Sequence, residues 1–116
     1  MVIIQNLRLI KRPGENRWPK QSKIWSEVAL GEDRDGNILF IYSPTPHSMY
    51  EFNDILLTLP IDIMCAQHLE GGPEASIYLK YKDFEIEKYG SHKPNLSGAD
   101  YSQGAAYVPN IIGFSQ

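Results

Sequence analysis

The spacing of apolar residues changes along the chain and predicts a series of short elements. Residues 2–10 are dense in β-branched side chains, which favours a strand. Residues 24–31 and 37–43 indicate two further strands, and the Asp35-Gly36 pair between them is a strong hairpin signal. The segment 43–47 contains two prolines, which remove backbone donors, so it is predicted to be a loop.

Helical spacing of apolar residues occurs between residues 48 and 59 and predicts one main helix. Ser48 followed by Glu51 fits a capping box at the start of this helix, and Pro60 marks its end. The apolar positions are Met49, Phe52, Ile55, Leu56 and Leu59. We expect this face to pack against the core, with cofactor binding as the alternative.

After the helix, the chain returns to strand-like patterns. Residues 61–66 predict a short buried strand, and residues 76–81 and 84–88 alternate as an antiparallel hairpin does. Residues 89–107 have no periodicity and predict a long loop, either functional or disordered. Residues 108–114 predict a short closing strand. The whole pattern indicates an α+β fold, mainly an antiparallel sheet of hairpins with one main helix packed on it.

Length and composition limit the class of protein. A chain of 116 residues is expected to form a single domain, residues 1–116. The net charge of −3, from 11 basic and 14 acidic residues, argues against general nucleic-acid binding. No apolar run approaches the ~20 residues of a membrane span, and the first residues lack the order of a signal peptide. Any export signal would lie outside this chain, so the compartment stays open.

One short segment, His68-Leu69-Glu70-Gly71-Gly72-Pro73-Glu74-Ala75-Ser76, combines more chemistry than any other. Its glycines permit positive φ and leave room for a ligand near the backbone. Its carboxylates are suited to stabilising positive charge or moving protons. The alternative is a polar hairpin turn between the strands predicted on either side.

Basic residues gather in the polar segment 11–23, which is predicted to be a loop. They are Lys11, Arg12, Arg17, Lys20 and Lys23. This loop is a candidate anion-binding arm, and a solvated connection is the alternative.

The order of several short motifs carries a resemblance. They are Ala29-Leu30-Gly31, Asp35-Gly36, the capped helix from Ser48, Leu69-Glu70-Gly71-Gly72, and the closing Val108-Pro109-Asn110-Ile111-Ile112-Gly113. In this order the chain resembles the phosphodiester glycosidase family, whose best-known member uncovers mannose 6-phosphate by removing a covering N-acetylglucosamine. The match spans nearly the whole chain and corresponds to the C-terminal part of the family's catalytic domain.

Three positions depart from the family pattern. Glu70 stands where the family has Asp, Pro73-Glu74-Ala75 replaces Gly-Ser-Ser, and Glu27 replaces an Arg. These changes indicate a subgroup whose substrate can differ from a sugar phosphodiester. Because the family's N-terminal part is not matched, the chain is expected to be a fragment or a short relative that self-associates. An open sheet edge would favour such a homo-oligomer.

The resemblance implies a hydrolase that cleaves a sugar-1-phosphodiester or a related glycoconjugate at the anomeric carbon, through an oxocarbenium-like state. Glu70 is the expected carboxylate facing the sugar, and Gly71 and Gly72 would let the substrate approach closely. Glu74 is a candidate second acid. His68 is a candidate proton shuttle, with a structural histidine at a strand end as the alternative.

The remaining candidates concern binding. Arg12 is expected to meet the phosphate, and Ser76 and Asn110 complete the predicted substrate-binding residues. Glu27 lies on a predicted strand, where it can simply pair across the sheet. His47 and His92 are expected to be bystanders.

Oxygen ligands from Glu70, Glu74 and Asp100 would suit a hard cation, but their spacing matches no dedicated loop pattern. No Cys/His spacing suits zinc, and Cys65 is expected to be a small buried hydrophobe. We therefore predict no metal and no cofactor.

Two other functions compete with the hydrolase. One is a non-catalytic carbohydrate-binding or assembly module, in which Tyr89, Tyr101 and Tyr107 stack on sugars. The other is a structural partner that needs a second chain.

Overall fold

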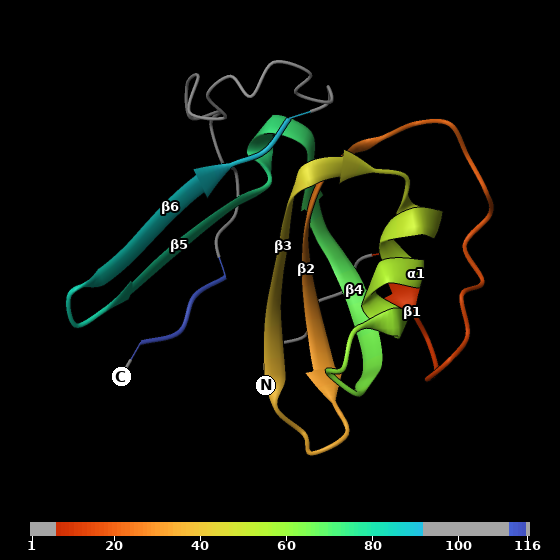
Figure 1. The fold of residues 1–116 in the computed structure, drawn as a ribbon, viewed down its shortest axis with the longest axis horizontal. Coiled ribbons are helices and arrows are strands. Elements are labelled where there is room, and N and C mark those ends of the chain that lie inside the picture. The colour runs from red at the N-terminus through yellow and green to blue at the C-terminus, as the bar shows by residue number, and fades with distance from the viewer. Residues whose placement is uncertain (1–6, 92–111, 116) are drawn as a thin grey trace.

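The computed structural model describes residues 7–91 and 112–115 and contains a four-stranded sheet, a two-stranded hairpin and one main helix (Figure 1). The helical elements are α1 (Met49–Thr58) and the short 3₁₀ helix η1 (Gly72–Glu74). The strands are β1 (Arg8–Ile10), β2 (Trp25–Asp33), β3 (Ile38–His47), β4 (Ile63–Gly71), β5 (Ser76–Tyr81) and β6 (Phe84–Tyr89). The four-stranded sheet has the order β1-β4-β2-β3, and all pairs are antiparallel. The predicted α+β fold is confirmed.

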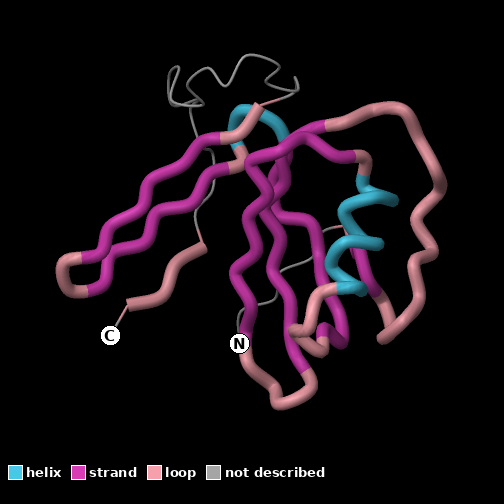
Figure 2. Tube along the Cα trace, viewed as in Figure 1, coloured by secondary structure: helices cyan, strands magenta, loops and turns pink. Residues whose placement is uncertain are grey.

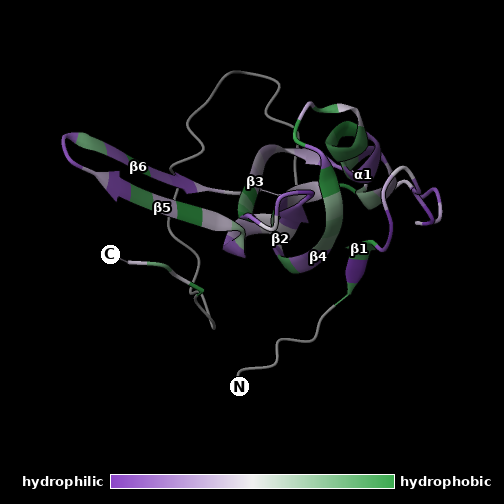
Figure 3. Ribbon diagram, turned by 90° about the horizontal axis from the view of Figure 1, so that it is seen from below, coloured by the Kyte–Doolittle hydropathy of each residue, from purple (hydrophilic) through white to green (hydrophobic). Residues whose placement is uncertain are grey.

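Helix α1 covers one face of the four-stranded sheet, and the core lies between them (Figures 1 and 3). The buried core residues are Leu9, Ile10, Ala29, Met49, Phe52, Leu56, Ile63 and Ala66. Three of them come from the predicted apolar face of the helix, whereas Ile55 and Leu59 remain 39% and 46% exposed. The apolar stripe is therefore wider than the surface that the sheet buries.

The start of α1 is the capping box that the sequence predicts. The backbone N–H of Glu51 donates to Ser48 Oγ at 3.2 Å, and the backbone N–H of Ser48 donates to Glu51 Oε2 at 3.4 Å. The helix ends at Thr58, two residues before Pro60, with Leu59 as its C-cap. Among the described residues, no helix has the length and hydropathy needed to cross a lipid bilayer.

Strand β3 continues through the two prolines, so the loop predicted over residues 43–47 is wrong. Because β3 is an edge strand, a proline there removes no ladder bond from the sheet interior. The β2–β3 register slips at this point, since Trp25 pairs with His47 and Glu27 with Ser43.

Strand β4 starts at Ile63 and extends to Gly71, well beyond the predicted end at residue 66. It is an interior strand that pairs with β1 and β2, and these two ladders support its length. The polar hairpin turn considered for residues 68–76 is also wrong, because β5 pairs with β6 and not with β4. Helix η1 instead joins the sheet to the hairpin (Figure 2).

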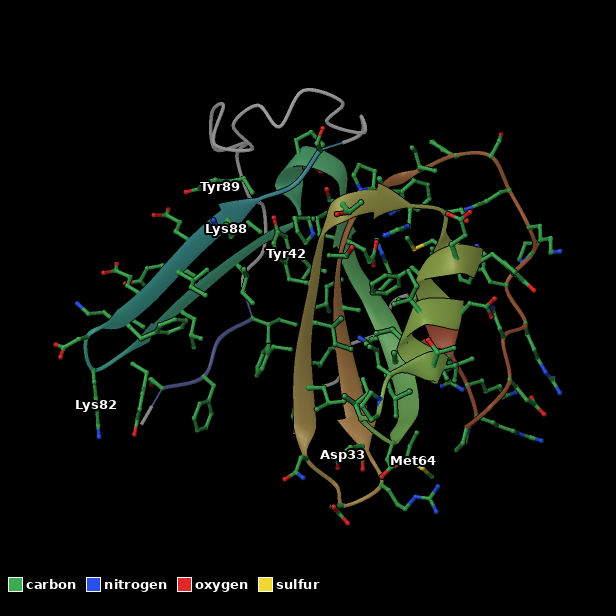
Figure 4. All side chains as sticks on the ribbon, viewed as in Figure 1. Asp33, Tyr42, Met64, Lys82, Lys88 and Tyr89 are labelled. Atoms are coloured by element: carbon green, nitrogen blue, oxygen red, sulfur yellow. The ribbon has the colours of Figure 1, made fainter. Side chains whose placement is uncertain are left out.

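The hairpin β5–β6 extends away from the four-stranded sheet as an arm, with Lys82 at its tip (Figure 4). Asp33 lies at the end of the sheet that is remote from the base of this arm. The base of the arm is held by Ser26, whose N–H donates to the carbonyl of Ser91 at 2.8 Å. The N–H of Ser91 in turn donates to Ser26 Oγ at 2.7 Å. These bonds fix the base of the arm to β2.

The two ends of the chain are described in part. Of the first predicted strand, residues 8–10 are β1 and residues 2–6 lie outside the described residues. Tyr89, expected in the long loop, ends β6, and residues 92–107 lie outside the described part. Residues 112–115 have no regular secondary structure, and residues 108–111 of the predicted closing strand are not described.

Candidate functional site

A buried acid and a histidine meet across β2 and β4. Oε1 of Glu27 lies 2.5 Å from Nδ1 of His68. The Glu27 side chain is 1% exposed and that of His68 is 18% exposed. Glu27 therefore pairs across the sheet, the alternative that the sequence left open for it.

The second oxygen of Glu27 also has a partner. Trp25, two residues earlier on β2, donates its Nε1–H to Oε2 of Glu27 at 2.9 Å. Each carboxylate oxygen thus has one donor, which offsets part of the cost of burying the charge.

Burial and neighbouring charges set the protonation of this pair. Burial raises the pKa of the Glu27 carboxyl above 4.5, although its bonds to His68 and Trp25 act in the opposite direction. The hydrogen bond to Glu27 raises the pKa of His68 above 6.5, against the effect of burial. The charge of Glu70 raises both pKa values further. The pair therefore holds a proton more firmly than either group would in water.

A β-bulge separates His68 from Glu70. Ala29 pairs with His68 and Val28 pairs with Glu70, so Leu69 is one extra residue on β4. Bulges of this kind re-aim side chains and recur beside active sites. Glu70 is partly buried, and its Oε1 accepts a hydrogen bond from the N–H of Gly71 at 3.1 Å. The structure thus joins His68 to Glu27 by a direct bond, whereas Glu70, the ladder partner of Val28, acts on this pair through its charge.

The two glycines differ in what they require. Gly72 has φ of +73°, a conformation that favours glycine, and it begins η1. Gly71 lies beside the Trp25 indole, since a Cβ built there would be 2.5 Å from Cδ1 of that ring. The sequence predicted that a substrate would approach closely at Gly71. The Trp25 indole occupies that space instead.

The other predicted residues lie around or away from this cluster. Glu74 is exposed in η1, and Ser76 begins β5. Arg12 is exposed in the loop after β1, which Asn16 holds against α1 by donating Nδ2–H to the carbonyl of Tyr50 at 2.8 Å. Asn110 lies outside the described residues.

Lys23, another basic residue of the candidate anion-binding arm, contacts the Trp25 ring. Nζ of Lys23 lies 5.9 Å from the centroid of the Trp25 ring. This contact brings a positive charge next to Trp25. Within the part of the chain that the structure describes, no group of three or more His, Cys, Asp or Glu could hold a metal ion.

Sequence reasoning missed Trp25 as part of the site and the bond that joins Glu27 to His68. The signal that points to them is the Trp-x-Glu spacing, which puts an aromatic ring and an acid on one face of an interior strand. Comparison with known proteins adds no family, because no family model, no curated protein and no solved structure matches the chain. The likeness to phosphodiester glycosidases rests on sequence motifs alone.

Proposed function

We propose that this protein is a hydrolase that cleaves a sugar-1-phosphodiester, or a related glycoconjugate, at the anomeric carbon. The observation that carries the proposal is the set of residues where the start of β2 lies beside the end of β4. There a carboxylate, Glu70, lies one bulge residue from a histidine, His68, and a buried acid, Glu27, holds that histidine. The order of the sequence motifs supports the substrate class.

Glu70 is the carboxylate assigned to the sugar. Cleavage at the anomeric carbon develops positive charge on the ring, and a nearby carboxylate stabilises that charge. The bond from the N–H of Gly71 orients Glu70 at the end of β4. Removing one preorganised oxyanion-hole donor typically costs roughly 10²–10³ in kcat, and we expect a similar loss for a carboxylate that stabilises developing positive charge.

His68 is the assigned proton donor. Its Nδ1 is used by Glu27, which leaves Nε2 as the nitrogen that can face a substrate. The raised pKa keeps the ring protonated to higher pH than an exposed histidine. The family pattern has an Arg at the position of Glu27, so here the positive charge is carried by His68, with Glu27 as its buried partner.

The charge of the cluster favours the sugar over the phosphate. Two carboxylates and one protonated histidine leave a net negative charge, which suits an oxocarbenium-like carbon. A phosphate leaving group needs a separate cation. We assign this role to Lys23, which lies against Trp25, in place of Arg12, which lies in the loop that packs on α1.

The test is release of N-acetylglucosamine from an N-acetylglucosamine-1-phosphodiester. Wild type is compared with Glu70→Gln, and Glu32→Gln serves as the matched control because Glu32 is exposed on β2 and has no assigned role in the site. We expect Glu70→Gln to lose roughly 10²–10³-fold in kcat and Glu32→Gln to remain near wild type. Equal turnover by wild type and Glu70→Gln would contradict the assignment.

An assembly module is the second candidate, favoured by the exposed arm. Register pairs Leu79 with Ile86 and Tyr81 with Phe84, so these apolar side chains share one face of the hairpin. Leu79, Tyr81 and Phe84 are 48%, 60% and 53% exposed. A lone two-stranded hairpin is marginally stable, and a second copy of the chain on this face would support it.

Sedimentation velocity tests this second candidate. An oligomer that dissociates in Leu79→Lys but persists in Lys80→Gln, on the opposite face, would support assembly through the arm. A wild type that is monomeric at every concentration, with no saturable binding of amino sugars, would contradict it.

A further inference from the structure

We propose that Gly71 and Trp25 act together as positioning residues. The missing side chain at Gly71 makes the space for the Trp25 indole, and the indole N–H fixes the Glu27 carboxylate against His68. The catalytic consequence rests on the proposed function, but the geometry and its test do not require turnover.

The register of β2 and β4 puts Gly71 beside Glu27. These two residues are direct partners in the antiparallel ladder, and such partners project from the same face of a sheet. On β4, the neighbour of the buried acid is therefore a residue with no side chain. This arrangement leaves the area over the backbone of Gly71 open to a side chain from β2.

The Trp25 indole fills that area. A Cβ at Gly71 would lie 2.5 Å from Cδ1, 2.6 Å from Nε1 and 3.3 Å from Cγ of the ring. Carbon atoms do not approach so closely, and an indole is rigid, so the ring has to move if residue 71 gains a methyl group. The two atoms that such a Cβ would meet most closely are Cδ1 and Nε1, and Nε1 is the atom that donates to Glu27.

The orientation of the Glu27 carboxylate matters because its two oxygens have different hydrogen-bond partners. Oε1 bonds His68 and Oε2 bonds Trp25. Without the indole N–H, Oε2 would lie buried with one donor fewer, and the carboxylate could rotate away from the imidazole. The Trp25 indole thus keeps the Glu27 carboxylate in the orientation in which Oε1 faces Nδ1 of His68.

Other charged groups lie near Trp25, Glu27 and His68, and the experiment has to distinguish their effects from those of the Glu27–His68 pair. Glu70 on β4 acts on both members of the pair, and Lys23 lies over the Trp25 ring. His47 is the ladder partner of Trp25 on β3, and its Nδ1 lies 3.9 Å from Oε2 of Glu51. A His47→Gln background removes the second histidine whose titration could reach the indole.

The chain offers its own internal comparison, because it has two tryptophans. Trp18 is also partly buried, but its Nε1 has no hydrogen-bond partner among residues 7–91 and 112–115. The two indole N–H signals in a ¹H–¹⁵N spectrum are assigned with Trp18→Phe and Trp25→Phe. One signal therefore reports on Glu27, and the other provides the control.

The experiment follows both indole signals through a pH titration. We expect the Trp25 signal to shift with the titration of the Glu27–His68 pair and to lose that shift in Glu27→Gln, while Trp18 does not follow it. We expect Gly71→Ala to move the Trp25 signal and abolish its response. Gly113→Ala is the matched control, because a Cβ there meets nothing within 4 Å.

The inference is overturned if the Trp25 signal in Gly71→Ala titrates as in wild type, or if wild type shows no such response. Should Gly71→Ala fail to fold, Trp25→Phe provides the second test. The bond from Trp25 lowers the pKa of Glu27, so its loss should raise that pKa in a ¹³C titration of the carboxyl. An unchanged Glu27 titration would also overturn the inference. A lack of sugar release would count against the proposed function alone.

Discussion

Glu27 and His68 are 41 residues apart in the chain, yet Oε1 of one lies 2.5 Å from Nδ1 of the other across two interior strands. A carboxylate in this position is costly unless it is paired and hydrogen-bonded. Glu27 has both kinds of partner, because the His68 imidazole binds one oxygen and the Trp25 indole binds the other. The pair therefore contributes to the stability of the fold and is also the centre of the candidate site.

Stability is expected to fall as pH rises from 4.5 to above 6.5. The folded-state pKa values of Glu27 and His68 lie above the ordinary values of 4.5 and 6.5, so the folded chain binds more protons than the unfolded chain. Their favourable contribution is complete below the unfolded values and is lost as pH rises through the folded values. Urea midpoints measured at about pH 5 and about pH 8 report this slope.

Glu27→Gln should remove most of this dependence of stability on pH. Asp33→Asn is the control, since hydrogen bonds from Asn37 lower the pKa of Asp33 below 3.8. The contribution of Asp33 is present above 3.8 and is lost only as pH falls through its folded value. A slope that survives Glu27→Gln would show that the pair does not control it.

Removing the histidine is expected to be severe. His68→Leu leaves the Glu27 carboxylate buried without its partner, a change that costs about 3–5 kcal/mol in comparable sites near neutral pH. The loss should shrink in acid, where Glu27 takes up a proton. Chemical denaturation measures it, with His47→Leu as control, because the exposed contact of His47 with Glu51 is worth at most about 1 kcal/mol. Equal losses in the two variants would contradict the account.

Ser48→Ala is expected to destabilise the protein by about 1 kcal/mol, since it removes the oxygen that accepts from the N–H of Glu51. Thermal unfolding measures the change. Thr58→Ala at the other end of α1 removes an exposed hydroxyl and should stay within about 0.5 kcal/mol of wild type. A larger loss in Thr58→Ala than in Ser48→Ala would count against the cap.

Ser26→Ala is expected to loosen the arm. Ser26 is fully buried, and its Oγ donates to the carbonyl of Pro44 at 2.6 Å while accepting from the N–H of Ser91. Without this oxygen, the amide of Ser91 should exchange with solvent markedly faster. Ser43→Ala is the control, because its Oγ donates to the exposed carbonyl of Thr45 at 2.9 Å. Unchanged protection of Ser91 would contradict this role.

Local signals in the sequence predicted much of the fold. The Ser48–Glu51 cap, the Asp-Gly turn after β2 and the alternation in β5 and β6 each depend on residues close in the chain. The outcome at residues 43–47 depends on position in the sheet instead. Prolines end an interior strand but are tolerated at an edge, and the sequence does not state which strand is the edge.

The site was predictable only in part, for a related reason. Glu70 and His68 stood out because they directly precede two glycines in a segment of unusual composition. Their link to Glu27 depends on the register of β2 and β4, which shifts at the Leu69 bulge. A slip of one residue would turn every side chain to the other face, and nothing local to Glu27 fixes that register.

The most direct test of the central claim is the pH dependence of sugar release from an N-acetylglucosamine-1-phosphodiester. The account predicts a kcat/KM profile that falls on the alkaline side as His68 loses its proton, at a pH above 6.5. In Glu27→Gln, this alkaline limb should move to lower pH, because the bond that raises the pKa of His68 is gone. No release at any pH, or an alkaline limb that stays in place in Glu27→Gln, would contradict the account.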